Sequence, residues 1–309
     1  MPTNTLDATL TDTITSITLK HIVPNVADNV NRSNVALMKV KKKTVSGGTV
    51  IQQPVRYQRG IQENYSGGQT LNTSYVDKNF AFIFNWKQKN FPIVLNGLDE
   101  IKNSGPEAIV DHVENETKAA EEDAMDSFAT GLYSAGTDSL EMDGARIWLS
   151  TSNTYGGISQ SSNSWAQAKI DSTTNSLSLA RMQERYEAAK EGNDAPTLIT
   201  FEESQFNVFW GLLQPQQRFS DGDTAKAGFR NLMFNGAICA EDSYCPTGYV
   251  IFWNMDRICL YSHSSRNFPG KFIPFEMPYD QDVRVAHYRW AGNLVCEQPR
   301  KQAALTALT

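Results

Sequence analysis

A strict two-residue alternation is the most regular hydrophobic pattern in the first third of the chain. It places four aromatic residues on one face of a strand, namely Phe80, Phe82, Phe84 and Trp86. An earlier strand-like run covers residues 49–57, where Pro54 allows only edge pairing or a bulge. Between the two runs lies a polar tip around Ser66, Gly67 and Gly68, whose glycines offer the positive φ angles of a chain reversal. These features predict a long β-hairpin over residues 45–86, which needs a further surface because an isolated ribbon is marginally stable in water.

A helical period of three and four residues is clearest between residues 104 and 133. Its apolar stripe consists of Ile109, Val113, Thr117, Ala120, Ala124, Phe128 and Leu132. Ser104 and Glu107 fit a capping box, and Gly131 and Gly136 mark the end. The other faces are strongly acidic, with Lys118 as their one basic residue. We expect a helix about 40 Å long whose acidic face is solvated.

An α/β unit follows a stretch rich in Ser, Thr, Asn and Gly over residues 134–172. That stretch contains a strand-like run at 146–149 and a shaped loop at 153–159, for which Trp165 is the expected anchor. We then predict a helix over 173–191, a strand over 196–199 and a third helix capped by Thr200 and Glu203. The core face of the third helix comprises Phe206, Phe209, Trp210 and Leu213. Strand, short turn and capped helix indicate a layered core of its own.

Strands dominate the chain from residue 231 onward, and no period is visible in the first 44 residues. The predicted strands cover residues 249–254, 258–261, 282–288 and 294–296, the last two joined by Gly292 and Asn293. Residues 1–44 are predicted to be an extended arm. Because this arm carries apolar residues such as Ile14 and Ile22, we expect it to lie against its own domain or a neighbour.

Composition sets limits on the class of protein. The 309 residues are 40% hydrophobic, enough for one large domain or two modest ones. No stretch approaches the roughly 20 apolar residues of a membrane span, and no secretory signal is present. The net charge of −6 argues against a dedicated nucleic-acid binder. One basic cluster, Lys39 with Lys41, Lys42 and Lys43, fits either a solvated strand end or contact with an acidic partner.

Candidate chemistry is sparse. The four cysteines, Cys239, Cys245, Cys259 and Cys296, form no CxxC pair and have no histidine at zinc-finger spacing, so we predict buried reduced thiols. Glycine-rich nucleotide loops, HExxH and GxSxG are absent from the sequence. A cysteine paired with His263 or His287 would be needed for a thiol nucleophile, and no spacing brings them together. We predict no catalytic residue, no metal ligand and no cofactor.

The order of these parts resembles the shell subunit of tailed bacteriophages, which has the Hong Kong 97-type capsid fold. Local stretches are similar as well, at residues 153–158 with Trp165, at 228–236 and at 282–300. Order and spacing, rather than a single motif, carry the resemblance from about residue 35 to the end.

The resemblance implies an α+β, Hong Kong 97-like fold with defined parts. These are an N-terminal arm (1–44), an extended loop formed by the hairpin (45–90), a peripheral domain with a spine helix at about 104–133 (91–172), a mainly axial α/β domain (173–270) and closing strands shared by both domains (271–309).

The implied function is that of a major capsid protein. It would self-assemble through pentamers and hexamers into an icosahedral head that encloses double-stranded DNA without sequence-specific binding. The intersubunit contact expected in the extended loop comprises Tyr65, Ser66, Gly67, Gly68 and Gln69, and the hairpin base comprises Phe80, Phe82, Phe84 and Trp86. The implied location is the virion, after assembly in the host bacterial cytoplasm and without a membrane.

Further partners and two alternatives complete the expectations. Because the chain starts at Met1 with a short arm, we expect a separate scaffolding protein, together with a portal and a decoration protein. The lysine, asparagine and glutamate that crosslink some family members have no match here, so no crosslinking site is predicted. An encapsulin-type compartment shell subunit and a cytosolic thiol hydrolase remain open alternatives.

Overall fold

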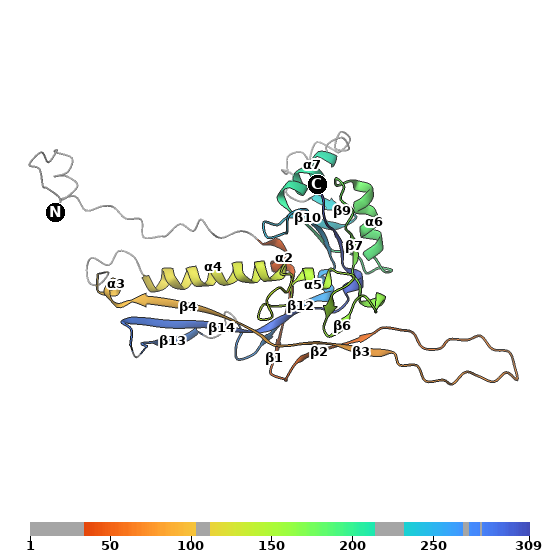
Figure 1. Ribbon diagram of the computed structural model, residues 1–309, viewed down its shortest axis with the longest axis horizontal. Helices are drawn as coiled ribbons and strands as arrows, with labels where there is room; N and C mark the ends of the chain where they lie inside the picture. The colour runs from red at the N-terminus through yellow and green to blue at the C-terminus, as the bar shows by residue number, and fades with distance from the viewer. Residues whose placement is uncertain (1–33, 103–111, 214–231, 268–271, 279) are drawn as a thin grey trace, which may run out of the picture.

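The computed structural model describes residues 34–102, 112–213, 232–267, 272–278 and 280–309. Two sheets form an α+β body, and a long loop leaves it at the end opposite a helix-covered sheet (Figure 1). The helix, α4 (His112–Leu132), runs along one face of that sheet.

The helix-covered sheet has five strands, here called the peripheral sheet. Its members are β1 (Lys41–Val45), β12 (Ile258–His263), β14 (Val283–Cys296), β13 (Phe272–Glu276) and β4 (Lys87–Asn96). The long strand β14 pairs antiparallel with β4, β12 and β13, whereas β1 runs parallel to β12. Alternation along β14 turns Ala286, Tyr288 and Trp290 toward α4, where all three are buried.

The second sheet has six strands, and its central strands are fully buried. Its order is β7 (Lys169–Asp171), β15 (Ala303–Leu305), β11 (Val250–Trp253), β8 (Leu198–Phe201), β10 (Ala237–Glu241) and β9 (Leu232–Phe234). Strands β8, β11 and β15 are buried at every position, which explains their continuous apolar sequences. Helix α6 (Leu179–Ala189) packs on β15 and β7, and α7 (Glu203–Leu213) packs on β10.

Short elements complete the body. They are α2 (Val35–Lys39), α3 (Gly97–Lys102), α5 (Ala145–Trp148), the hairpin of β5 (Thr154–Tyr155) and β6 (Ile158–Ser159), and the 3₁₀ turns η2 (Ser164–Ala166), η5 (Met255–Arg257) and η6 (Pro299–Lys301). The base of the extended loop is the antiparallel strand pair β2 (Ile51–Arg56) and β3 (Asn79–Phe84).

Helix α4 confirms the predicted apolar stripe from Ala120 to Leu132, since Ala120, Ala124, Phe128 and Leu132 are all buried, and Thr117 is half-buried. Ile109 and the side chain of Val113 lie outside the described part of the chain. The capping residues Ser104 and Glu107 lie outside the described part of the chain.

Four local predictions are wrong, and each error has a structural cause. Residues 146–149 are not a strand, because α5 buries Trp148 after a turn at Gly144. The helix predicted from residue 173 begins at Leu179, where the Ser178 hydroxyl accepts from the Arg181 backbone N–H. Thr200 caps no helix, since it is buried in β8 and accepts a 2.7 Å hydrogen bond from Trp253 Nε1.

The fourth error concerns Gly292 and Asn293, which lie inside β14 and not in a turn between two strands. A side chain at Gly292 would collide with the Tyr261 carbonyl oxygen of the neighbouring strand β12 and with the Trp290 ring. Glycine is required at this position for close approach of the strands.

The end of the predicted arm also belongs to the folded body. Residues 34–45 form α2 and β1, with Ala36 and Val40 buried, because β1 completes the edge of the peripheral sheet. The basic cluster is exposed, with Lys39 at the end of α2 and the other three lysines on β1, where Lys41 pairs with Asp256 at 2.8 Å.

Candidate assembly surface

The base of the extended loop is held by a buried aromatic cluster. Phe82 and Phe84 are 0% and 2% exposed, and Phe82 lies 5.3 Å from Tyr155 and 5.9 Å from Trp165 between ring centroids. The β5–β6 hairpin closes this contact, since the Ile83 N–H donates to the Gly156 carbonyl at 3.0 Å. Gly156 has φ +55°, and a Cβ there would lie 2.7 Å from the Phe82 Cβ. The loop base is therefore part of the subunit's own core.

The four alternating aromatics do not share one buried face, contrary to our expectation. Phe80 is 52% exposed, because the β2–β3 pair has already run past the body at that point. Trp86 lies beyond the end of β3, where its Nε1 donates to the Gly48 carbonyl at 2.8 Å and its ring meets His263 edge-on. Only Phe82 and Phe84 are fully buried at the base.

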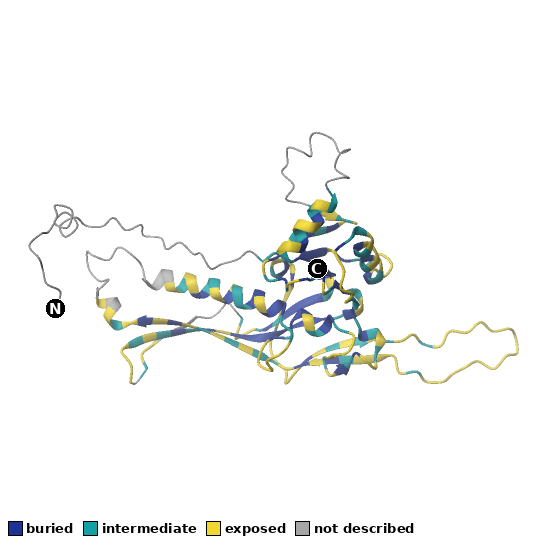
Figure 2. Cartoon of the chain, turned by 45° about the horizontal axis from the view of Figure 1, so that its top comes forward, coloured by how far each residue is buried: buried dark blue, intermediate teal, exposed yellow. Residues whose placement is uncertain are grey.

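The distal end of the loop, residues 61–75, is exposed at every position (Figure 2). The β2–β3 ladder ends where the Tyr57 N–H donates to the Lys78 carbonyl at 3.1 Å. Beyond that point, one backbone hydrogen bond is present in the described loop, from Gln69 N–H to the Ser66 carbonyl at 3.2 Å. The expected contact residues Tyr65, Ser66, Gly67, Gly68 and Gln69 form this turn, with Gly68 at φ +87°.

Large apolar side chains on the distal loop face solvent. The exposed fraction is 69% for Tyr65, 91% for Tyr75 and 50% for Leu71. Tyr65 lies four residues after Ile61 and Tyr75 four residues after Leu71, with polar residues between them, and none of the described residues covers these side chains. An exposed segment with unpaired backbone and several large apolar side chains is a candidate surface for contact with another chain.

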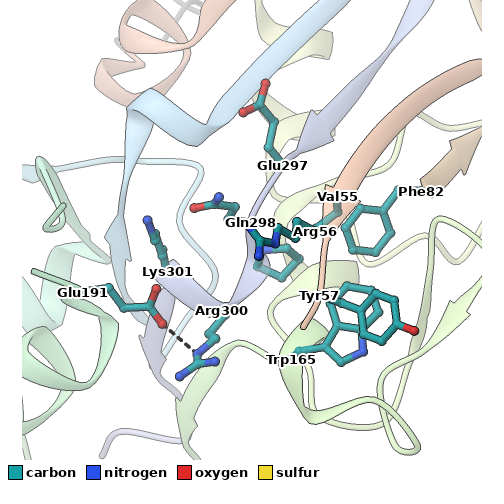
Figure 3. A pocket seen from close by; sticks show the side chains of 11 residues that line it. Val55, Arg56, Tyr57, Phe82, Trp165, Glu191, Glu297, Gln298, Arg300 and Lys301 are labelled. Carbon is teal, nitrogen blue, oxygen red and sulfur yellow. Dashed lines mark ion pairs between the residues drawn. The ribbon is translucent and has the colours of Figure 1, made fainter. Parts of the chain in front are cut away.

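A pocket of about 150 Å³ marks the joint between the loop base and the body (Figure 3). Tyr57 and Trp165 lie 5.5 Å apart between ring centroids on one side of it. On the other side, Arg300 Nε donates to Glu191 at 2.7 Å. The first contact joins the loop base to η2, and the second joins η6 to the residues that follow α6.

Asp194 is a charged anchor close to this joint. Its carboxylate accepts from Lys301 Nζ at 2.6 Å, Asn254 Nδ2 at 2.6 Å and Arg257 Nη2 at 2.7 Å. Burial opposes ionisation, but these three donors hold the pKa of Asp194 well below its ordinary value. The carboxylate therefore stays charged and links the segment at Asp194 to the segments that carry Asn254, Arg257 and Lys301.

A second carboxylate, Asp242, joins α2 and α4 to the six-stranded sheet. It is buried and accepts from the Tyr133 hydroxyl at 2.9 Å and the Tyr244 N–H at 3.0 Å. Burial raises the pKa of Asp242, and the hydrogen bonds partly offset this effect. Neither Asp194 nor Asp242 was identified from the sequence, because their partners lie far away along the chain.

The acidic face of α4 is partly engaged with the body. Tyr244 donates to Asp126, and Lys89 Nζ donates to the Ser127 carbonyl at 2.8 Å while lying 5.4 Å from the Phe128 ring centroid. Burial lowers the pKa of Lys89. The more exposed Glu116 and Asp123 face solvent.

The thiols lack the exposure of a reactive nucleophile. All four cysteines are free and buried, and burial raises the pKa of Cys239 to about 12. His263 Nδ1 instead lies 2.7 Å from the Ser265 hydroxyl. Across the described ranges there is no group of three metal-ligating side chains. In the same part of the chain, no helix combines the length and apolarity needed to cross a bilayer.

The fold and this surface define a protein with a long projecting loop whose distal end, residues 61–75, is exposed at every position. No protein-family model matches the chain, and no curated protein matches its sequence. Solved structures do match. A chain of the Cyanophage A-1(L) capsid asymmetric unit is 16% identical, with a TM-score of 0.74 over 96% of this chain and 98% of that one.

Two further structures are similar over nearly their whole length. The capsid of a native GTA particle is 8% identical with a TM-score of 0.71, covering 99% of this chain and 100% of that one. The SrpI encapsulin of Synechococcus elongatus PCC 7942 is 9% identical with a TM-score of 0.61, covering 96% of this chain and 95% of that one. The predicted α+β fold of the phage capsid type is therefore confirmed, and with it the resemblance indicated by the sequence.

Proposed function

We propose that the chain is the major capsid protein of a tailed bacteriophage, a shell subunit that assembles with copies of itself into an icosahedral head. The capsid fold supports this proposal, and the distal loop carries it. Residues 61–75 are exposed throughout and lack a backbone ladder, so the described part of a single copy offers them a few hydrogen bonds but no packed surface. In a shell, a neighbouring subunit would cover them.

The parts of the fold take the roles implied by the resemblance. Residues 45–90 serve as the extended loop that contacts a neighbour through Tyr65–Gln69. The peripheral sheet with α4 and the six-stranded sheet serve as the peripheral and axial domains. The head encloses double-stranded DNA without reading its sequence, with a scaffolding protein, a portal and a decoration protein as partners. Assembly takes place in the host cytoplasm, and the chain ends in the virion.

Closed shells are the direct test. The full chain, expressed with the scaffolding protein of the same virus, is expected to form particles with five- and six-fold capsomers in electron micrographs. A monomer under these conditions, with its loop already ordered, would contradict the proposal.

The encapsulin alternative rests on the SrpI likeness, which extends over 96% of this chain. The higher TM-scores with a cyanophage capsid and a GTA capsid favour a phage head. The contents of native particles distinguish the two, because a head contains DNA and a compartment contains a protein cargo.

The thiol-hydrolase alternative requires a reactive thiolate at neutral pH. Since all four thiols are buried and the pKa of Cys239 is about 12, a thiol-directed probe should label the folded chain slowly and the unfolded chain fast. Rapid labelling of one cysteine in the folded chain would revive this alternative.

A further inference from the structure

We propose that Arg266 and Arg289, on the face of the peripheral sheet turned away from α4, form a docking site for Glu63 in the extended loop of a second copy. This inference rests on the proposed shell function, and it names the surface that receives the loop.

The two arginines lie side by side on that face, here called the open face. Trp290 points toward α4, so alternation along β14 turns its neighbour Arg289 outward. Arg289 pairs with Asn90 in the register of β4, and Arg266 Nη1 donates to Gln88 Oε1 at 2.7 Å on the same strand. Together they line a shallow hollow of about 330 Å³.

The hollow carries positive charge without a matching carboxylate. Among the described residues, neither arginine forms an ion pair, and the one polar partner of the Arg266 guanidinium is the neutral amide of Gln88. Lys89 also borders the hollow, but its ammonium points to the other side of the sheet, where it donates to Ser127 of α4. In a chain with net charge −6, an uncompensated pair of arginines indicates an anionic partner.

The distal loop carries a carboxylate, that of Glu63, which can pair with these arginines. Glu63 is the one charged residue between positions 61 and 76. Its Oε1 accepts from the Asn72 N–H at 2.6 Å, which holds the two legs of the loop together and orients the carboxylate. The second oxygen remains available for a guanidinium, the donor geometry that matches a carboxylate best.

The carboxylate must come from another copy. The loop and the peripheral sheet extend from the body in opposite directions, so the distal loop points away from its own open face (Figure 1). Seven extended residues separate Arg56, at the end of β2, from Glu63, a reach of about 23 Å. That reach allows the distal loop to lie across an adjacent subunit. Apolar side chains such as Leu71 and Tyr65 would then rest beside Val94, which is 49% exposed on the open face.

Charge reversal tests the pairing under conditions in which the parent chain forms shells. Glu63→Arg and Arg289→Glu should each lower the shell yield about tenfold, because a like-charge contact is repeated at every loop. The double variant should recover most of the yield. Gln62→Arg and Lys42→Glu are the matched controls, which change charge beside Glu63 and on β1 and should assemble normally.

Disulfide crosslinking can test independently whether Glu63 of one copy lies near Arg289 of another. Introduced cysteines can be used for this because the four native thiols are buried. Glu63→Cys combined with Arg289→Cys should give disulfide-linked oligomers in shells treated with a mild oxidant, and no link in unassembled subunits. Glu63→Cys with Lys42→Cys should remain unlinked.

Failure of this inference and of the shell function are distinguishable. Parent shells with normal yields for both single reversals, or with no rescue and no disulfide link in the double variants, would overturn the docking site and leave the shell function intact. Arg289→Glu shells that form normally but hold less DNA would assign the arginines to nucleic acid and overturn the proposal. Absence of parent shells would overturn the shell function itself.

Discussion

The two ends of the extended loop differ in what stabilises them. At the base, Phe82 is fully buried against Tyr155 and Trp165, and a backbone hydrogen bond from Ile83 to Gly156 joins the loop to the β5–β6 hairpin. At the distal end, residues 61–75 are exposed and Tyr75 is 91% in solvent. One continuous segment thus contains a part stabilised by its own chain and a part that, in the proposed shell, a neighbour would stabilise. Mutations at the two ends should therefore fail at different stages, the first in folding and the second in assembly.

The strongest contrast is between two phenylalanines of one strand. Phe82→Asp places an unpaired charge in the core and should destabilise the subunit by about 4 kcal/mol or more. Phe80→Asp, at a position already 52% exposed, should cost less than about 1 kcal/mol. Chemical denaturation of the unassembled subunit measures both, and equal losses would show that the base does not end at Phe82.

A pair of glycines sharpens the same contrast. Gly156→Ala forces a side chain into a left-handed backbone and against Phe82, so we expect a loss of about 1–3 kcal/mol. Gly67→Ala adds a methyl group to open space at the distal turn and should change subunit stability by less than about 0.5 kcal/mol. Thermal melting of the two variants against the parent provides the comparison. A Gly156→Ala variant that melts like the parent would contradict the close packing at the base.

Asp194 tests whether the body can be weakened without touching the distal loop. Asp194→Asn should lower the free energy of unfolding by about 1–2 kcal/mol at pH 7, because Lys301 and Arg257 lose their anion. Since the pKa of Asp194 is depressed in the folded state, its contribution is complete above the unfolded value of about 4. The contribution is lost as the pH falls further, so parent and variant should converge in acid. A difference that is constant from pH 7 to pH 2 would refute this assignment.

Hydrophobic periodicity correctly predicted those helices and strands whose buried residues recur at regular short intervals along the chain. The α4 stripe from Ala120 to Leu132 and the pairing of β2 with β3 follow directly from such patterns. The two-residue hydrophobic alternation places Phe80 and Phe82 on the same face of β3. It contains no information on where the strand leaves the folded body, so it did not distinguish exposed Phe80 from buried Phe82. Gly292 was read as a turn because glycine serves both in turns and in close approach of strands.

Long-range polar contacts left no signal in the sequence. Asp194 meets Lys301 across 107 positions, and Asp242 meets Tyr133 across 109. The arginines of the open face lie on separate segments, and only the sheet brings Arg266 and Arg289 together. Contacts of this kind depend on topology, which a periodic pattern does not contain.

Deleting Asn64–Gln69 tests the central claim most directly, because it removes the distal turn and leaves the base and Glu63 in place. The variant should match the parent in soluble yield and in the melting temperature of the unassembled subunit. It should fail to form closed shells, or form shells that open at lower temperature, as seen by sedimentation and electron microscopy. The Gly67→Ala variant should assemble normally. If the deletion variant assembles and its shells survive heating like those of the parent, the distal loop is not an intersubunit contact and the account is contradicted.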